Sequence, residues 1–156
     1  MPHRFGNASV SARLRRIHDR LLNAFGPQHW WPGETPFEVM VGAVLTQNTN
    51  WGNVERAISN LKSAGMLQPQ RLAACPLPML AAMIRPSGYF NVKARRLRAF
   101  LEWLISRTRD GNPERLRGVP TKRLRPELLS VNGIGPETAD SILLYALGRR
   151  TFVVDA

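Results

Sequence analysis

Apolar residues recur at helical spacing along most of this chain of 156 residues, and glycine or proline interrupts each run. In residues 9–25, for example, Leu14, Ile17 and Leu21 fall on one helical face, and Gly26 ends the run. No segment shows the strict alternation of a half-buried strand, and the short apolar stretch "TFVV" near the end could be extended or a buried coil. The sequence therefore predicts an all-α fold, built by packing helices with short connections.

Two helix starts carry capping residues. Thr35, with Pro36 at the first helical position and Glu38 three residues after Thr35, forms a capping box before the apolar run "FEVMVGAVL". Because that helix is apolar on most sides, we expect it near the centre of the core. Asn50 or Thr49 is expected to cap the helix that follows.

Few residues of this chain are suited to hold a metal or an inorganic cluster. The single cysteine, Cys75, excludes an internal disulfide and excludes an iron–sulfur cluster held by several thiolates of this chain. His3, His18 and His29 lack metal-ligand spacing. We therefore expect no cofactor and no metal held by side chains. No apolar run approaches the ~20 residues that a membrane helix needs, so we expect no membrane partner.

The net charge of +11 is the strongest global signal, and its excess is concentrated. Residues 93–127 contain 11 lysines and arginines against four acidic residues. Such a stretch is typical of a surface that binds a polyanion, although from charge alone a solvated helix face is an equally good explanation. Apolar residues interleave with the charges, as in "ARRLRAFLEWLI", which indicates a folded surface and favours nucleic acid over a membrane.

A Gly-Ile-Gly turn, Gly133 to Gly135, lies between two apolar helical stretches. Glycine permits backbone conformations closed to other residues, and it lets another molecule approach the backbone closely. Pro136 suits the first turn of the next helix, whose free N–H groups favour an anion such as phosphate. Ile134 is expected to pack against the core. A plain helix-turn-helix corner without a ligand is the alternative, because Gly-x-Gly alone is a weak motif.

Several separate motifs, in the same order, resemble the endonuclease III superfamily of DNA glycosylases. "LLSVNGIGPETADSILLYALG" followed by "VVD" resembles its helix-hairpin-helix and trailing aspartate, and "PFEVMVGAVLTQNTNWGNVERAISNL" resembles its early helix pair. "HWWPGETPFE", "LTQNTNW" and "RPSGYFNVKA" are most similar to the branch of bacterial 3-methyladenine DNA glycosylases. The resemblance covers the chain from about Ala24 onward. It implies a helical fold that flips a damaged base out of duplex DNA and cleaves its glycosidic bond.

The resemblance places Asp155 at the position of the catalytic aspartate. Its carboxylate would stabilise an oxocarbenium-like sugar and would position or deprotonate the attacking water, whereas a helix cap is the alternative role. Glu137 stands where the bifunctional endonuclease III pattern has a lysine that forms a Schiff base. Because glutamate cannot form an imine, the resemblance implies hydrolysis without strand cleavage. An ordinary acid in a first helical turn is the alternative for Glu137.

Aromatic residues are expected to hold the flipped base, with Glu137 beside them in the substrate pocket. Trp51 matches the position where the methylpurine branch stacks an aromatic ring under the base, and an electron-rich indole suits a positively charged alkylated purine. Trp30, Trp31 and Pro32 match the other wall of the pocket. An ordinary aromatic core is the alternative for each tryptophan.

The remaining candidates are expected to contact DNA. Gln47 matches the residue that fills the gap left by the flipped base, although a side-chain amide there can also cap a helix. Gly133 and Gly135 are expected to bind phosphate through backbone amides, and carbonyls near Gly133 are expected to hold a monovalent cation. Charge and position select four further candidates for contacts to the DNA backbone: Lys93, Arg95, Arg96 and Lys122.

The resemblance also predicts the organisation of the chain. Residues 1–27 are expected to form an N-terminal helix of a second lobe, and residues 28–156 a helical domain with the hairpin at about residues 122–148. Superfamily members continue beyond the aspartate, so the second lobe is expected to be incomplete and the glycosylase to be truncated at its C-terminus. Asp155 then has no following helix to support its rotamer, and an inactive fragment is one expected outcome.

The sequence therefore predicts a base-excision-repair DNA glycosylase for alkylated purines, acting as a monomer on double-stranded DNA in the cytoplasm, at the bacterial nucleoid. The first alternative is an endonuclease III-type glycosylase and lyase for oxidised pyrimidines. The second is a non-catalytic helix-hairpin-helix module, which would bind duplex DNA with steep salt dependence and release no base.

Overall fold

The computed structural model describes residues 7–28 and 31–155. The chain forms two compact units, Met1–Pro32 and Gly33–Ala156. Every regular element among the described residues is helical, which confirms the all-α prediction. The stretch "TFVV" forms neither a helix nor a strand.

The first unit contains one long helix, α1 (Asn7–Phe25). It ends as predicted at Gly26, which has a left-handed φ of 69° and donates its N–H to the carbonyl of Leu22 over 2.8 Å. The apolar side chains of α1 are exposed; they are Val10, Leu14, Ile17, Leu21, Leu22 and Phe25. Among the described residues, no helix is long and apolar enough to cross a membrane.

The predicted capping box opens α2 (Pro36–Leu45) in the second unit. The Thr35 hydroxyl accepts the N–H of Glu38 over 3.1 Å, which confirms the cap. The Glu38 carboxylate in turn accepts the N–H of Glu34 over 3.2 Å, so the box extends one residue further back than predicted. The Lys62 ammonium forms an ion pair of 2.9 Å with Glu38 and so compensates the charge of this buried carboxylate.

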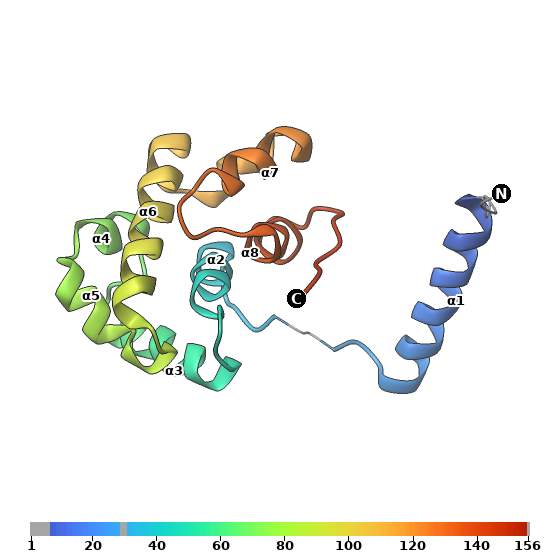
Figure 1. Cartoon of the computed structure of the whole chain (residues 1–156), viewed down its shortest axis with the longest axis horizontal. Coiled ribbons are helices and arrows are strands. Elements are labelled where there is room, and N and C mark those ends of the chain that lie inside the picture. The colour runs from blue at the N-terminus through green and yellow to red at the C-terminus, as the bar shows by residue number, and fades with distance from the viewer. Residues whose placement is uncertain (1–6, 29–30, 156) are drawn as a thin grey trace. The chain divides into compact units, whose positions relative to one another are not determined.

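Helix α2 forms the centre of the second unit, as its apolar composition predicts (Figure 1). Met40, Val41, Val44 and Leu45 are completely buried. The elements that contact α2 are α3 (Trp51–Ser63), α6 (Phe90–Thr108), η2 (Pro113–Leu116), α8 (Pro136–Ser141) and the π-helical turn η3 (Ile142–Ala146).

The other helices pack around α3 and α6. Asn50 caps α3 by accepting the N–H of Asn53 over 3.1 Å, which decides between the two predicted caps. Helix α6 buries the apolar stripe that its spacing predicts, including Leu97, Phe100 and Leu104. The short helices at its side are α4 (Pro69–Ala74), α5 (Leu77–Met83) and η1 (Arg85–Ser87).

The predicted helical hairpin consists of α7 (Thr121–Leu129), a tight turn, and α8 continuing into η3. Ile134 is 5% exposed, so it packs against the core as expected. The Arg125 guanidinium on α7 donates two hydrogen bonds, of 2.8 and 2.9 Å, to the buried carboxylate of Asp140 on α8. This bidentate pair joins the two helices of the hairpin.

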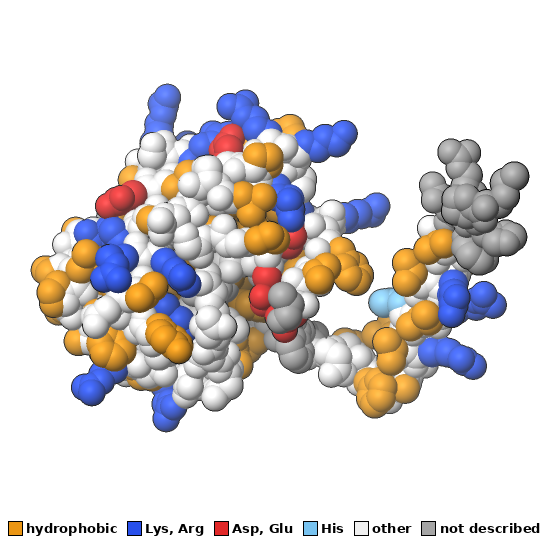
Figure 2. Space-filling view, viewed as in Figure 1, with side chains coloured by type: hydrophobic (Ala, Val, Ile, Leu, Met, Phe, Trp, Pro, Cys, Tyr) orange, Lys and Arg blue, Asp and Glu red, His pale blue; other side chains and the backbone are white. Residues whose placement is uncertain are grey.

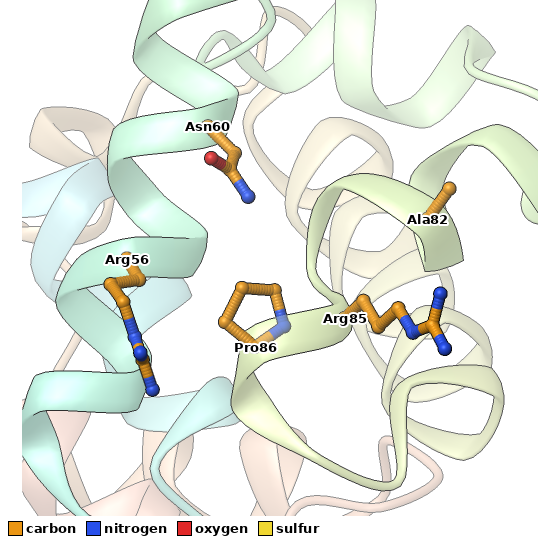
Figure 3. A pocket seen from close by; sticks show the side chains of 5 residues that line it. All are labelled: Arg56, Asn60, Ala82, Arg85 and Pro86. Atoms are coloured by element: carbon orange, nitrogen blue, oxygen red, sulfur yellow. The ribbon is translucent and has the colours of Figure 1, made fainter.

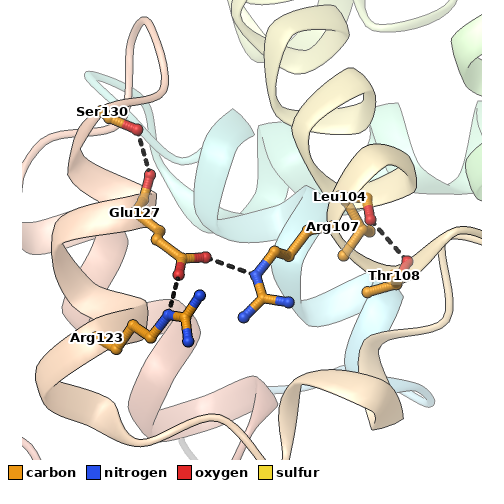
Figure 4. Close-up of polar contacts among 6 residues, drawn as sticks. All are labelled: Leu104, Arg107, Thr108, Arg123, Glu127 and Ser130. Atoms are coloured by element: carbon orange, nitrogen blue, oxygen red, sulfur yellow. Dashed lines mark hydrogen bonds and ion pairs between the residues drawn. The ribbon is translucent and has the colours of Figure 1, made fainter.

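Internal pairing accounts for most of the basic stretch 93–127, which weakens the sequence argument for a polyanion surface. Arg107 and Arg123 both donate to Glu127, and the first pair links α6 to α7 (Figure 4). On the face seen in Figure 2, Lys and Arg side chains are spread over the surface and do not gather in one patch. Within the described residues, eight of the 11 donate to internal acceptors: Lys93, Arg96, Arg98, Arg107, Arg115, Arg117, Arg123 and Arg125.

Replacement of Asp140 by Asn tests the pair that joins α7 and α8. The Arg125 guanidinium lowers the pKa of Asp140, so the pair stabilises the fold above the usual carboxyl range and this contribution is lost as the pH falls through the lowered value. We expect Asp140→Asn to lower the free energy of unfolding at pH 7 by about 1–3 kcal/mol, measured by urea titration. The loss should shrink at pH 3.

Glu114→Gln provides the control, because Glu114 pairs with Arg117 on the exposed surface. It should change the stability little at either pH. Equal losses for the two variants would contradict a special role for the buried pair.

Candidate functional site

The hairpin turn requires glycine at position 133. Gly133 has a left-handed φ of 86°, and a Cβ atom there would lie 2.3 Å from the Cγ atom of Arg96. The aliphatic part of Arg96 therefore lies directly against the turn. Both observations exclude a larger residue, in agreement with the predicted conformational role of this glycine.

Gly135 differs, because nothing inside the protein requires it. Its φ of −88° is open to any residue, and a Cβ atom there would meet no atom within 4 Å. The conformational freedom that glycine permits is therefore used at Gly133 and not at Gly135. Backbone–backbone hydrogen bonds of the described residues do not use the N–H groups of Gly133 or Gly135. These donors suit an anion that approaches the turn from outside.

Gln47 connects the turn to the rest of the domain. Its Nε2 donates to the carbonyl of Gly133 over 2.9 Å and to the hydroxyl of Thr138 over 3.1 Å. Its Oε1 accepts a hydrogen bond of 2.5 Å from Nη1 of Arg96. The amide is thus engaged inside the protein in this conformation. Insertion of Gln47 into DNA stays a prediction, and it would require these bonds to break.

Two carboxyl groups interact at the start of α8. Partial desolvation raises the pKa of Glu137 above its usual value, although the side chain reaches solvent. The negative charge of Asp155 and a hydrogen bond between the two side chains raise that pKa further. The fold therefore brings together two acids that lie 18 positions apart in the sequence. Glu137 therefore keeps its proton to a higher pH than an isolated glutamate does.

Two anchors fix the segment that leads to Asp155. Arg149 donates to the carbonyls of Leu116 and Val119, at 3.2 and 3.0 Å, and thereby binds this segment to the end of η2. Thr151 donates to the Asp140 carboxylate over 3.3 Å. Asp155 itself is exposed. The anchors hold the base of the segment, and the carboxyl of Asp155 extends from it toward Glu137.

The hairpin and the aspartate that follows it match a known family. A model of the HhH-GPD superfamily of base excision DNA repair proteins matches residues 41–156. The chain belongs to this superfamily. A protein of Methanocaldococcus jannaschii, named provisionally as a DNA repair glycosylase, is 50% identical over 145 residues, which cover 92% of this chain and 65% of that protein. The chain thus spans just under two thirds of that relative's length.

Solved structures of glycosylases are also similar to this HhH-GPD chain. The 3-methyladenine DNA glycosylase MagIII of H. pylori, bound to 1,N6-ethenoadenine, has a TM-score of 0.77 and 34% identity, covering 92% of this chain and 67% of that one. Endonuclease III in a non-covalent complex with DNA has a TM-score of 0.74 and 26% identity, covering 92% and 63%. Endonuclease III of Sulfolobus acidocaldarius is 29% identical over 120 residues.

Lys93 is not available for the predicted contact to the DNA backbone of an HhH-GPD protein. Its side chain is 1% exposed, and its ammonium donates to carbonyl oxygens inside the domain. The prediction was made from charge and position, and burial overturns it. Arg95 and Lys122 are exposed and form no ion pair or hydrogen bond within the described part of the chain, so both stay candidates. Arg96 is half-buried against the turn.

The residues predicted to line the base pocket belong to different units of this HhH-GPD chain. Trp51 is the first residue of α3 and is half-buried in the second unit, which also holds Glu137. Trp31 is half-buried and Pro32 is exposed in the first unit. Trp30 lies outside the described residues. The shared pocket of these residues therefore stays a prediction.

A surface pocket of about 410 Å³ lies between α3 and η1, and it was not predicted. Arg56 and Arg85 lie on either side of Pro86 in this pocket (Figure 3). Its lining contains no tryptophan and no carboxylate, so it suits an anionic group better than a flipped base. Arg56 and Arg85 both lie outside the basic stretch 93–127 that the sequence analysis singled out.

Sequence reasoning also missed Tyr89, which lies two residues after the end of η1 and is the N-cap residue of α6. Its side chain is 72% exposed, and its φ of 44° is left-handed, which is unusual for a bulky residue. A strained backbone that holds an aromatic ring in solvent makes Tyr89 a candidate for contact with another molecule. The sequence signal was the aromatic pair in "SGYFN", at the start of α6.

The residues present do not fit an iron–sulfur cluster held by four cysteines. Cys75 is buried at the end of α4, and no group of three or more His, Cys, Asp or Glu side chains among the described residues could hold a metal ion. The carbonyl of Gly133 accepts a hydrogen bond from Gln47. A monovalent cation on the hairpin carbonyls stays a prediction.

The two glycines of the turn should respond differently to alanine. Gly133→Ala should lower the free energy of unfolding by roughly 1–3 kcal/mol, because of its left-handed φ and the contact with Arg96. Gly135→Ala should leave the thermal midpoint unchanged but weaken binding to duplex DNA about tenfold, since a methyl group would keep phosphate from the turn. Thermal melts and fluorescence anisotropy measure the two effects. Unchanged DNA affinity in Gly135→Ala would contradict a phosphate contact there.

The acid pair should be visible by NMR titration of the side-chain carboxyl carbons. Glu137 should titrate above 4.5, and Asp155→Asn should lower its pKa without restoring the usual value, because the desolvation persists. Protonated Glu137 thus contributes stability below pH 4.5 that is lost as the pH rises through the raised value. Asp110→Asn, outside the pair, provides the control. A pKa of Glu137 that is identical in wild type and Asp155→Asn would exclude the interaction.

Proposed function

We propose that this chain is the part of a DNA glycosylase that flips an alkylated purine out of duplex DNA and releases it by hydrolysis. Superfamily membership supports the general class, base excision repair. The pairing of Glu137 with Asp155 beside the hairpin turn is the observation that carries the finer proposal. In the described part of the chain, this pair offers two acids and no amine.

The two acids suit hydrolysis of a glycosidic bond. As the base leaves, positive charge develops on the sugar, and the Asp155 carboxylate would stabilise that charge. Water attacking the sugar must lose a proton, which a carboxylate within reach can accept. Glu137 can hold a proton beside Asp155, because its pKa is raised. Neither side chain can form an imine with the opened sugar, so cleavage of the DNA strand through this position is not expected.

The grip on DNA would come from the hairpin and a few exposed cations. The N–H groups of Gly133 and Gly135 suit one phosphate. Arg95 and Lys122 are exposed and have no ion-pair partner among the described residues, so their charges are free for further phosphates.

The aromatic candidates and one similar solved structure support the proposed class of base. Trp51 lies half-buried at the start of α3, directly after the turn that carries Gln47. Stacking on an indole is favourable for any purine, and cation–π attraction favours a purine made cationic by alkylation. The similar MagIII structure is named as a 3-methyladenine DNA glycosylase. An oxidised pyrimidine is the alternative substrate, favoured by the similarity to endonuclease III.

Base release and strand cleavage should be measured separately, using duplexes that contain 3-methyladenine or an oxidised pyrimidine. We expect the wild-type chain to release 3-methyladenine without nicking the strand. Asp155→Asn should reduce release by at least about a hundredfold, since it removes the charge that stabilises the sugar cation. Its affinity for duplex DNA should stay within about twofold, because phosphate contacts determine that affinity.

Each other outcome identifies a different function. Release accompanied by nicking would contradict the inference from Glu137. Selective release of the oxidised pyrimidine would support the alternative substrate. Salt-sensitive duplex binding without any release would indicate a DNA-binding module that lacks the chemistry.

A further inference from the structure

Lys93 presents a buried cation without an acidic partner. Its ammonium donates to the carbonyl of Leu45 over 2.8 Å and to the carbonyl of Ser87 over 2.5 Å. No carboxylate in the described part of the chain pairs with it, and burial together with the nearby charge of Arg96 lowers the pKa of Lys93 to about 8. A buried ammonium is costly, so its two carbonyl partners must offset much of that cost.

Each of these carbonyls belongs to the last residue of a helix. Leu45 is the last residue of α2, and Ser87 is the last residue of η1. Carbonyls in the final turn of a helix have no partner within the helix, and a cation there also complements the helix dipole. Lys93 therefore caps two helices at once, and it joins points that lie 42 positions apart in the sequence.

The two capped helices lead directly into two of the three places in the described part of the second unit where a residue other than glycine has a left-handed φ; the third is Arg109. Asn48 has a φ of 53° three residues after Leu45, and Tyr89 has a φ of 44° two residues after Ser87. Left-handed backbone costs free energy in residues other than glycine, and it persists only where the surroundings enforce it. Lys93 lies at the base of both turns and can enforce their positions.

The first of these turns, residues 46–50 between α2 and α3, is called the Gln47 turn, and the second, residues 88–89 between η1 and α6, the Tyr89 turn. Gln47 binds the hairpin by donating to the carbonyl of Gly133. Arg96, one helical turn after Lys93 on α6, donates to Gln47 and lies against Gly133. Consecutive turns of one helix thus hold the Gln47 turn, the Tyr89 turn and the hairpin. The exposed Tyr89 ring suits stacking on a base beside an opened position in the duplex, whereas Gln47 would contact DNA only after its bonds to Gly133, Thr138 and Arg96 break.

We propose that Lys93 is a positioning residue that fixes the Gln47 turn and the Tyr89 turn at one spacing, so that the two turns engage damaged DNA together. The DNA part of this proposal rests on the proposed function. Lys93 itself touches no DNA, since its side chain is buried. Its loss should affect both turns at once, although they are remote in sequence.

Amide hydrogen exchange on the full chain, without DNA, tests whether Lys93 holds the two turns together; this role of Lys93 is called the clamp. Amides that report on it are those of Thr46 and Thr49 in the first turn and of Ser87 and Gly88 in the second. Lys93→Met keeps the length of the side chain and removes its donors, and it should accelerate exchange in both turns by roughly tenfold or more. Lys93→Arg keeps charge and donors and should restore most of the protection. Lys122→Met, a matched loss of charge on the surface, should leave these amides unchanged.

Acceleration in one turn only, or equal acceleration at the Ile134 amide of the hairpin, would overturn the proposal. If Lys93→Met does not fold, an NMR measurement on the wild-type protein tests whether Lys93 holds the two turns. The chain has three lysines, Lys62, Lys93 and Lys122, and a buried ammonium bonded to carbonyls should give a slowly exchanging NMR signal that the exposed Lys122 lacks. Absence of that signal for Lys93 would also refute the clamp.

Binding to DNA then tests the functional half. Wild type should prefer a duplex with an abasic-site analogue over an intact duplex, and Lys93→Met should reduce this preference about tenfold, because the two turns no longer engage together. The dependence of affinity on salt should not change, since Lys93 contacts no phosphate. A reduced salt dependence would mean that Lys93 binds phosphate directly, against the proposal. A wild type without preference would refute the proposed function, while the exchange data would still decide on the clamp.

Discussion

The burial of α2 is the constraint on which the second unit depends. A helix surrounded by protein cannot use water for the N–H and C=O groups at its ends, so other residues must supply partners. At the N-terminus, Thr35 and Glu38 do this within the local sequence. At the C-terminus, the carbonyl of Leu45 is satisfied by Lys93 of α6. This bond between Lys93 and Leu45 joins segments that are remote in sequence, and it positions the turn that follows the helix.

The same helix, α6, also shapes the hairpin. Arg96 packs its aliphatic part against Gly133 and directs its guanidinium to Gln47. The turn that suits a phosphate is therefore supported from inside by a cation that is itself occupied. This explains why the two glycines of the turn differ: Gly133 is required by its neighbour, whereas Gly135 borders open space. An external ligand is the simplest physical reason for a glycine at the second position.

The charge of the chain illustrates how a sequence signal can mislead. A run of basic residues indicates a surface for anions only when the charges remain free. Here many of them cap helices or pair with acids, as Arg125 does with Asp140. Arg149 likewise donates to the carbonyl of Leu116 at the end of η2 and to that of Val119 just after it. Of the basic stretch 93–127, the side chains of three exposed cations, Arg95, Arg109 and Lys122, form no ion pair or hydrogen bond within the described residues, and these remain for DNA together with backbone amides.

The sequence by itself determined the all-α class, the caps of α2 and α3, and the hairpin, because helical periodicity, capping side chains and turn glycines act over a few residues. Together with the family motifs, it also singled out Asp155 and Glu137. Only the tertiary structure decided that these two acids meet, that Lys93 is buried, and that Gly133 rather than Gly135 is conformationally required. Each of these depends on contacts between remote segments, and local sequence carries no record of which atoms will surround a side chain after the helices pack.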